Sequence, residues 1–373
     1  MALQAVTALV LLKLPGTRGW LDGANAVVQG IGEATSQAAS FLFGYLAGGP
    51  LPFSETSPGS AFIVAFRVLP LVVVMSAVSA LLFYWRILPA VGRGFAWVLR
   101  RTLGLSGPTG VAAATDVFLG IAEAPLFVKP YLKAMGRGGD AASLARLIDL
   151  VLYATVLAPV LPDAAGHVLV ASFIARPGAV AVAHLLFPDG LGRDAPVPEV
   201  GRGAESTMDA IARGAMDGIQ MLFAIVAMIL VLFALVNLVN LSLAAFGNWG
   251  GERVTLQRIL AYGLRPFLWL VAIPAAELDV ASRVFATKVL LNEFVAFLEL
   301  ARTGAEGLSS RSRVILTYAM CGFANVASMG ILVGSLTTLA PELRREVLSL
   351  GWWSLLAGNV ATGLSGAVVG LFY

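Results

Sequence analysis

The sequence predicts an all-α polytopic membrane protein, and three features of its composition support that prediction. Charged residues make up only 13% of the 373 residues, whereas an average soluble chain carries about 25%. Hydrophobic residues make up 58%, and the mean hydropathy is +0.85. Because backbone polar groups must be satisfied internally within a bilayer, apolar segments of this kind are expected to cross it as helices.

The same composition excludes several classes of protein. The net charge of +3 is small and scattered, so it provides no footprint for nucleic-acid binding. Cys321 is the single cysteine, and His167 and His184 are the only histidines. These counts exclude an internal disulfide framework, a multi-cysteine zinc site and a histidine-rich metal centre. A soluble enzyme domain and a disordered protein are also at odds with so many apolar residues.

The first hundred residues predict helices of different kinds. Met1–Leu14 is apolar but too short to cross a bilayer alone, and its positive charge, Lys13, follows the apolar run instead of preceding it. This order favours a short membrane helix over a secretory signal. The next expected elements are a Gly/Ala-rich helix at Trp20–Leu46, a loop at Gly48–Gly59, a first clear span at Ala61–Leu82, an aromatic and cationic belt at Phe83–Arg86 and an amphipathic surface helix at Ile87–Leu103.

Apolar segments continue to the end of the chain. Ile219–Phe246 is the longest, enough to cross a bilayer with tilt, and the polar stretch Pro188–Glu205 before it is an expected loop. The other expected apolar segments are Gly110–Tyr131, Leu144–Leu161, Gly166–Phe187, Ile259–Ile273, Leu278–Leu300, Val314–Leu339 and Leu348–Phe372.

Two of these segments are interrupted by an acidic residue. Gly110–Tyr131 is broken near Glu123 and Leu278–Leu300 near Glu293, and a longer apolar segment with internal polar residues follows each. Paired interrupted segments in the two halves of a chain are typical of transporters built from repeats. Such transporters bind their substrate where the helices break.

Glu123 is the first candidate site residue. A carboxylate at bilayer depth costs about 3 kcal/mol on insertion scales, so it needs a partner or a wet cavity. Gly120 permits a helix to end, and Pro125 suits the first turn of a new helix. Glu123 would then lie near the positive end of a half-helix. The alternative is a surface loop, where a glutamate costs nothing.

The second half of the chain supplies two further candidates. Near Glu293, Lys288 and Asn292 are four residues apart and would share a helical face; the alternative is a polar seam that joins two helices. Asn325 and Ser328 are three residues apart among small residues that ease unwinding. Helix packing reinforced by hydrogen bonds explains that window equally well.

Other ionisable residues have weaker signals. Asp116, four residues before Gly120, could ligate a cation or exchange a proton, because burial of a carboxylate favours its protonated form. It could equally pair with a nearby cation. Asp279 and Arg283 are four residues apart and are expected to pair, and Cys321 is expected to be a small buried apolar side chain.

At these positions the chain resembles the concentrative nucleoside transporter family. The matching windows are specific together, and their order and spacing fit over nearly the whole chain. They are Thr287-Lys288 running into Leu291-Asn292-Glu293-Phe294-Val295-Ala296, then Cys321-Gly322-Phe323-Ala324-Asn325, then Phe118-Leu119-Gly120 with Glu123-Ala124-Pro125-Leu126, and finally Ala96-Trp97-Val98-Leu99-Arg100 and Leu103-Gly104-Leu105-Ser106-Gly107.

The resemblance implies an inverted-repeat, elevator-type homotrimer in which each protomer has a scaffold and a moving transport domain. Re-entrant hairpins are expected near Ser106–Tyr131 and Ala276–Leu300, and discontinuous helices near Leu144–Leu161 and Val314–Leu339. The implied division is 1–105 for N-terminal scaffold helices with a shortened first helix, 106–190 for the first half of the transport domain, 191–258 for a loop and a long scaffold helix, 259–340 for the second half of the transport domain, and 341–373 for a C-terminal helix.

The resemblance also implies roles for individual residues. In the family, residues matching Glu293, Asn325 and Ser328 hold the ribose. The glutamate matching Glu123 faces the base together with the two residues before it. A carboxylate can accept hydrogen bonds from ribose hydroxyls, whose burial without partners would be costly. The expected substrate-binding residues are Glu123, Ile121, Ala122, Glu293, Phe323, Asn325 and Ser328.

Three departures from the family pattern bear on specificity and coupling. Ile121 and Ala122 replace the Gln and Thr or Ser that commonly hydrogen-bond the base, so base selectivity is expected to differ. Asp116 stands where sodium-coupled members have an asparagine, which favours protons. Leu147–Thr155 is bulky, where the family's first discontinuous helix is rich in Gly, Ser and Thr, and Asp149 within it is a second candidate for ion coupling.

These inferences lead to a secondary active transporter, multi-pass in the inner membrane, that imports nucleosides down a cation gradient. We expect no cofactor and no metal beyond a sodium ion near Asp116, and the coupling ion is sodium or proton. One alternative is a non-transporting or altered-specificity relative with a structural or sensory role. A membrane-embedded enzyme is less favoured, because it would need a catalytic histidine, a Ser–base pair or clustered metal-binding carboxylates.

Overall fold

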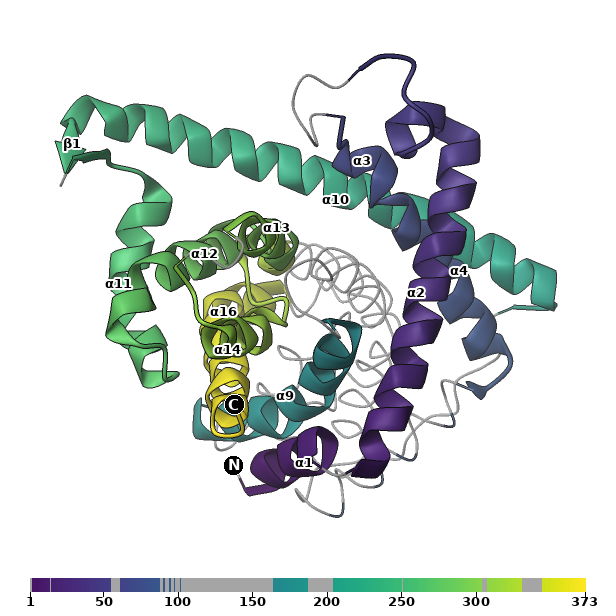
Figure 1. Cartoon of the computed structure of the whole chain (residues 1–373), viewed down its shortest axis with the longest axis horizontal. Helices are drawn as coiled ribbons and strands as arrows, with labels where there is room; N and C mark the ends of the chain where they lie inside the picture. The colour runs from purple at the N-terminus through teal and green to yellow at the C-terminus, as the bar shows by residue number, and fades with distance from the viewer. Residues whose placement is uncertain are drawn as a thin grey trace.

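The structure, a computed structural model of the chain, is helical apart from one short hairpin in the residues that it describes (Figure 1). This agrees with the predicted all-α class. The described residues are 2–13, 15–54, 61–87, 90, 94, 97, 101, 164–186, 204–249, 251–303, 307–330 and 344–373.

The two ends of the chain pack together (Figure 1). Helix α1 (Ala2–Lys13) has 12 residues and rises about 18 Å, so it is too short to cross a bilayer core of about 30 Å alone, as predicted. Its buried Gln4 donates a hydrogen bond of 3.2 Å to the hydroxyl of Ser365 in α16 (Arg344–Gly370). Helix α2 (Pro15–Phe43) follows α1 and continues into the 3-10 turn η1 (Gly44–Ala47).

Two described helical segments are long and apolar enough to cross a membrane. Val64–Tyr84 comprises the short α3 (Val64–Arg67) and α4 (Pro70–Tyr84), and Thr207–Phe246 comprises α10 (Thr207–Leu243) and the 3-10 turn η2 (Ala244–Phe246). Both agree with predicted spans. However, α10 begins twelve residues before the predicted start at Ile219, because the Ser206 hydroxyl caps the helix by accepting a 3.1 Å hydrogen bond from the Asp209 amide.

Helices α4 and α10 cross at close range (Figure 1). Gly214 and Gly218 lie one turn apart on α10 at this crossing. A Cβ atom at Gly218 would lie 2.7 Å from the Cα of Val73, and one at Gly214 would lie 2.8 Å from the Cα of Ala77. Small residues four apart allow two membrane helices to bring their backbones into contact, so this pair of glycines fixes how α10 crosses α4.

A short antiparallel hairpin after α10 departs from the all-helical prediction. Strands β1 (Asn248–Trp249) and β2 (Glu252–Arg253) pair directly. Gly247 and Gly251 have φ angles of 80° and 83°, a backbone region that glycine enters without steric cost. The chain can therefore reverse here between α10 and α11 (Leu256–Leu270).

The predicted interruptions in the second half are confirmed. The segment Leu278–Leu300 forms two helices, α12 (Leu278–Leu290) and α13 (Glu293–Thr303). A 3-10 turn, η3 (Ala275–Glu277), precedes them. In the segment Val314–Leu339, α14 (Ser310–Met320) ends, and helical backbone resumes at 326–330.

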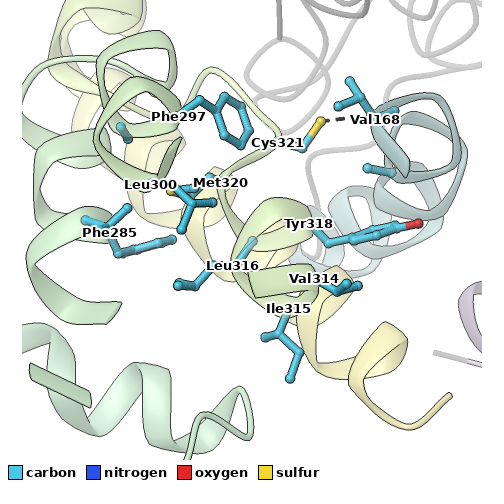
Figure 2. Packing of buried hydrophobic residues seen from close by; sticks show 14 of the residues in the cluster. Val168, Phe285, Phe297, Leu300, Val314, Ile315, Leu316, Tyr318, Met320 and Cys321 are labelled. Carbon is cyan, nitrogen blue, oxygen red and sulfur yellow. Dashed lines mark hydrogen bonds between the residues drawn. The ribbon is translucent and has the colours of Figure 1, made fainter. Parts of the chain in front are cut away.

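Helix α14 lies at the centre of the core. It packs against α9 (Ala164–Leu186), α12, α13 and α16. Figure 2 shows Val314, Ile315, Leu316, Tyr318 and Met320 of α14 among side chains of its neighbours. The fully buried Tyr318 hydroxyl lies 3.1 Å from Nδ1 of His167 in α9. The Cys321 thiol is buried against the carbonyl of Val168, in line with its expected role as a small apolar side chain.

Several predicted elements lie wholly or almost wholly outside the described residues. They are the surface helix Ile87–Leu103, the segments Gly110–Tyr131 and Leu144–Leu161, and the loop Pro188–Glu205. The first expected hairpin and the first expected discontinuous helix therefore stay predictions.

The close α4–α10 crossing predicts a stability difference between two glycine substitutions. Gly218→Ala should destabilise the fold by roughly 1–3 kcal/mol, because its methyl group would overlap the Val73 backbone. Gly263→Ala in α11 is the matched control, since no atom lies within 4 Å of its Cβ position, and it should gain up to about 1 kcal/mol of helix propensity. Melting temperatures of the purified variants in detergent measure both effects. Equal melting temperatures would contradict the close crossing.

Candidate functional site

The break between α12 and α13 places a carboxylate at a helix N-terminus. Asn292 caps α13, since its Oδ1 accepts a 2.9 Å hydrogen bond from the amide of Val295. Glu293 is therefore the first residue of α13, and it is 2% exposed. The partial positive charge of the helix N-terminus favours a carboxylate there, which offsets part of the cost of its burial.

A second helix start lies opposite. Helix α14 ends at Met320, and the backbone from Cys321 to Asn325 is unwound. Its amides at Gly322, Ala324 and Asn325 bond carbonyls only two residues earlier. The chain becomes helical again at 326–330, where Asn325 acts as the cap: its Oδ1 accepts a 2.8 Å hydrogen bond from the amide of Ser328. An asparagine thus caps each of the two facing half-helices.

The two helix starts meet through their side chains. Nδ2 of Asn325 donates a hydrogen bond to Oε2 of Glu293. Asn325 is fully buried and Ser328 is 6% exposed. Three of the predicted site residues, Glu293, Asn325 and Ser328, are therefore brought together in the protein interior, and Phe323 lies half-buried in the unwound segment beside them.

The convergence suits recognition of a neutral polyol. A buried carboxylate offers two oxygens with several acceptor positions, and Oε2 of Glu293 accepts a hydrogen bond from the Asn325 amide. Helix N-termini supply positive potential without adding a mobile charge. Hydroxyl groups that donate to the carboxylate would form charge-assisted hydrogen bonds in a site of low dielectric constant.

A buried polar chain holds the unwound segment in place. The ammonium group of Lys288 in α12, fully buried, donates a 2.6 Å hydrogen bond to Oδ1 of Asn359 in α16. Nδ2 of Asn359 donates in turn to the carbonyl of Ala324, at 2.9 Å. The neighbouring Gly358 lies so close to Ala324 that a Cβ atom there would be 2.6 Å from the Ala324 methyl. Helices α12 and α16 thus fix the backbone immediately before Asn325.

The hydrogen bonds of Lys288 and Asn359 bear on one expectation from the sequence, and they add a residue, Asn359, that the sequence analysis did not predict. Lys288 and Asn292 would share a helical face only if the segment between them were helical, and α12 ends at Leu290, so that condition is not met. Lys288 instead contacts Asn359, which was not a predicted site residue. An amide within an apolar C-terminal helix was the available signal, because such amides commonly bond to neighbouring helices.

Helices α12 and α13 form a helical hairpin, with its two ends side by side. Glu277, just before α12, accepts hydrogen bonds of 3.2 Å from both the amide and the hydroxyl of Ser309, which follows α13. The start of α12 and the end of α13 therefore lie together, and the Leu291–Asn292 turn forms the opposite end. The predicted pair of Asp279 and Arg283 is confirmed in α12, with 3.0 Å between Oδ2 and Nη2.

The other predicted site residues lie outside the described residues. These are Glu123, Ile121 and Ala122 on the expected base side, and Asp116 and Asp149 as candidates for ion coupling. Within the described part of the chain, no group of three His, Cys, Asp or Glu side chains could hold a metal ion.

Comparison with known proteins identifies similar transporters. A family model described as Na⁺ dependent nucleoside transporter C-terminus matches residues 167–370. A Haemophilus influenzae protein described as an uncharacterized transporter is 32% identical, covering 100% of this chain and 90% of that protein. The nucleoside permease NupC of Helicobacter pylori is 29% identical, covering 99% of this chain and 89% of that protein.

The structural similarity extends over the whole chain. A structure of CNTnw in an inward-facing substrate-bound state has a TM-score of 0.85 and 31% sequence identity, covering 100% of this chain and 90% of that chain. These matched proteins are transporters, which agrees with the expectation that the chain is not an enzyme.

The buried polar chain predicts an energetic coupling between Lys288 and Asn359. Asn359→Leu should cost about 1–3 kcal/mol, because it removes a hydrogen-bond partner from both the Lys288 ammonium group and the Ala324 carbonyl. Once Lys288→Met has removed the ammonium group, Asn359→Leu should cost about 1 kcal/mol less. Melting temperatures of the two single variants and the double variant measure this coupling.

The control is Asn237→Leu, which removes an exposed amide from α10 and should leave the melting temperature nearly unchanged. Strict additivity of Lys288→Met and Asn359→Leu would contradict the proposed chain.

Proposed function

The chain belongs to the concentrative, Na⁺-dependent nucleoside transporter family, and from that membership we propose that it is a secondary active transporter that imports nucleosides together with a cation. The single observation that carries the proposal is the meeting of Glu293 and Asn325 between two capped half-helices. The ribose hydroxyls of a nucleoside would donate to the Glu293 carboxylate, with Asn325 and Ser328 beside them. Glu123, Ile121 and Ala122 would lie towards the base.

The α12–α13 pair supports the proposal of a re-entrant hairpin. Its helices have 13 and 11 residues and rise about 20 Å and 17 Å, so neither crosses a bilayer core of about 30 Å. Both ends of the pair lie together through Glu277 and Ser309. A hairpin that enters and leaves on one side would carry Glu293 to bilayer depth, where a transported solute needs its polar contacts.

An elevator-like movement is consistent with the packing of the helices, because the helices around the site pack on one another and α10 packs elsewhere. The proposed substrate contacts lie at the start of α13 and in the segment that follows α14, and α14 packs on α12, α13 and α16. Helix α10 instead packs mainly on α4. We propose that α4 and α10 belong to the fixed scaffold and that the hairpin and α14 belong to the moving body. CNTnw, which has been solved in an inward-facing state, offers a relative in which such movement can be compared.

The apolar surface of α10 supports a homotrimer in the inner membrane. Phe223, Leu230, Leu238 and Leu241 are each more than 60% exposed. Such a surface must be covered by lipid or by another protomer, and a trimer would cover part of it. The coupling ion is sodium or proton; the family description names sodium, while Asp116 in place of an asparagine favours protons, with Asp149 as a second candidate.

A second function, a non-transporting or altered-specificity relative, is favoured by the replacements at Ile121 and Ala122 on the base side and at Asp116 in the expected ion site. Labelled uridine and adenosine counterflow in proteoliposomes distinguishes the two. Accumulation of labelled nucleoside in exchange for unlabelled nucleoside supports transport. The absence of accumulation for both nucleosides supports the second function.

Substitution of the central carboxylate tests the site directly. Glu293→Gln should lower uptake efficiency by roughly 30-fold, because charge-assisted hydrogen bonds to two hydroxyls each lose about 1 kcal/mol when they become neutral ones. Glu205→Gln, an exposed glutamate before α10, is the matched control and should leave uptake unchanged. Initial rates of labelled uridine uptake measure both. Unchanged uptake by Glu293→Gln would remove this site from the mechanism.

The coupling ion is tested by separating the two gradients. We expect uptake under a pH gradient alone to exceed uptake under a sodium gradient alone, because Asp116 can carry a proton. Asp116→Asn should reverse or reduce that preference. Initial uptake rates in proteoliposomes under each gradient give the answer, and an unaltered ion dependence in Asp116→Asn would count against its role.

A further inference from the structure

A cleft of about 790 Å³ lies between α10 and the α12–α13 pair. Glu293 and Asn325 do not line it, so it is separate from the proposed substrate site. Helix α10 contributes Ile229, Phe233 and Asn240 from a single face, since these residues are four and seven apart. The hairpin contributes residues of α12 and α13 along the opposite wall.

The cleft is apolar at one end and cationic at the other. At the apolar end, Ile229 and Phe233 of α10 face Phe294 and Leu298 of α13. Ile229 lies eleven residues before Asn240, about 16 Å along the helix, and Asn240 is close to the end of α10.

At the polar end, β2 is joined to the base of the hairpin. Oε2 of Glu252 lies 2.9 Å from Nη2 of Arg283 in α12. The exposed aromatic side chains of Phe246 and Trp249 lie on the same connection after α10. Because aromatic side chains gather at the membrane–water interface, the polar end is expected at the level of lipid headgroups.

Cations outnumber anions at that end. Four arginines line the cleft, against the two carboxylates of Glu252 and Glu299. Arg283 is committed to Glu252 and Asp279. By contrast, the exposed Arg253 and Arg302 have no ion-pair partner among the residues that the structure describes.

The remaining arginine that lines the cleft, Arg258, is almost fully buried in its wall. It is 9% exposed, its Nη1 donates a 2.8 Å hydrogen bond to the Glu252 carbonyl, and its Nε lies 3.7 Å from Oε2 of the Glu252 carboxylate. Within the described part of the protein, the cleft arginines that form no ion pair are therefore Arg253 and Arg302.

We propose that this cleft binds one anionic phospholipid. The phosphate lies at Arg253 and Arg302, because guanidinium groups match phosphate oxygens in geometry and charge. An acyl chain extends along Ile229, Phe233 and Leu298. A small polar solute would leave the apolar end unfilled, and a wholly apolar partner would leave the arginines without counter-charges. The lipid touches both α10 and the hairpin, the two parts that are proposed to move relative to each other.

Lipid binding to the purified full-length protein tests the proposal. In native mass spectrometry, the wild type should bind phosphatidylglycerol about 30-fold more tightly than phosphatidylcholine, since each arginine near an anionic headgroup contributes about a factor of five. Arg253→Gln with Arg302→Gln should abolish most of that preference. The matched control removes two exposed arginines at the start of α16, Arg344→Gln with Arg345→Gln, and should keep it.

A second measurement uses the wild type alone. Phosphatidylglycerol with a photoreactive acyl chain should label peptides that contain Ile229–Phe233 or Phe294–Leu298. Equal affinity for the two lipids, a preference that survives Arg253→Gln with Arg302→Gln, or labelling confined to other helices would each overturn the proposal. Nucleoside uptake does not enter either readout, so failure here leaves the proposed transport function untouched.

Discussion

Burial of the Glu293 carboxylate is the constraint on which the rest of the structure depends. A charge buried in the protein interior is tolerated only where the protein supplies compensating interactions. Here they come from the N-terminus of α13, which Asn292 caps, and from the amide of Asn325 across a second helix start. Two helices must break for these groups to meet, and each break leaves backbone amides and carbonyls that need partners in turn.

Those partners explain features that are otherwise unrelated. Asn359 of α16 bonds the Ala324 carbonyl of the unwound segment and receives the buried ammonium group of Lys288. Gly358 lets α16 approach Ala324. Helix α14, which precedes the unwound segment, is buried from Val314 to Met320 in the core. The polar groups around Glu293 are held in place by the tightly packed apolar core that surrounds them. Helices α4 and α10, which pack closely on each other, form a separate unit.

The sequence predicted the parts of this arrangement that leave a local signal. A glutamate and an asparagine inside apolar segments marked both interruptions in the second half, and the long apolar run marked α10. Lys288 could not be matched to Asn359, because the two are 71 residues apart and meet only because α14 packs on both α12 and α16. The β1–β2 hairpin was missed because its strands are two residues long. The expectations for Glu123, Asp116 and Asp149 stay predictions, since these residues lie outside the described part of the chain.

The central claim is that the Glu293 carboxylate recognises the sugar hydroxyls of a nucleoside. Its most direct test is the binding affinity of uridine and of 2′,3′-dideoxyuridine, measured by calorimetry for the wild type and for Glu293→Gln. The wild type should prefer uridine by at least about 10-fold, because each charge-assisted hydrogen bond is worth about 1.5–3 kcal/mol, and the variant should lose most of this preference. A preference of the same size in both proteins would contradict the account.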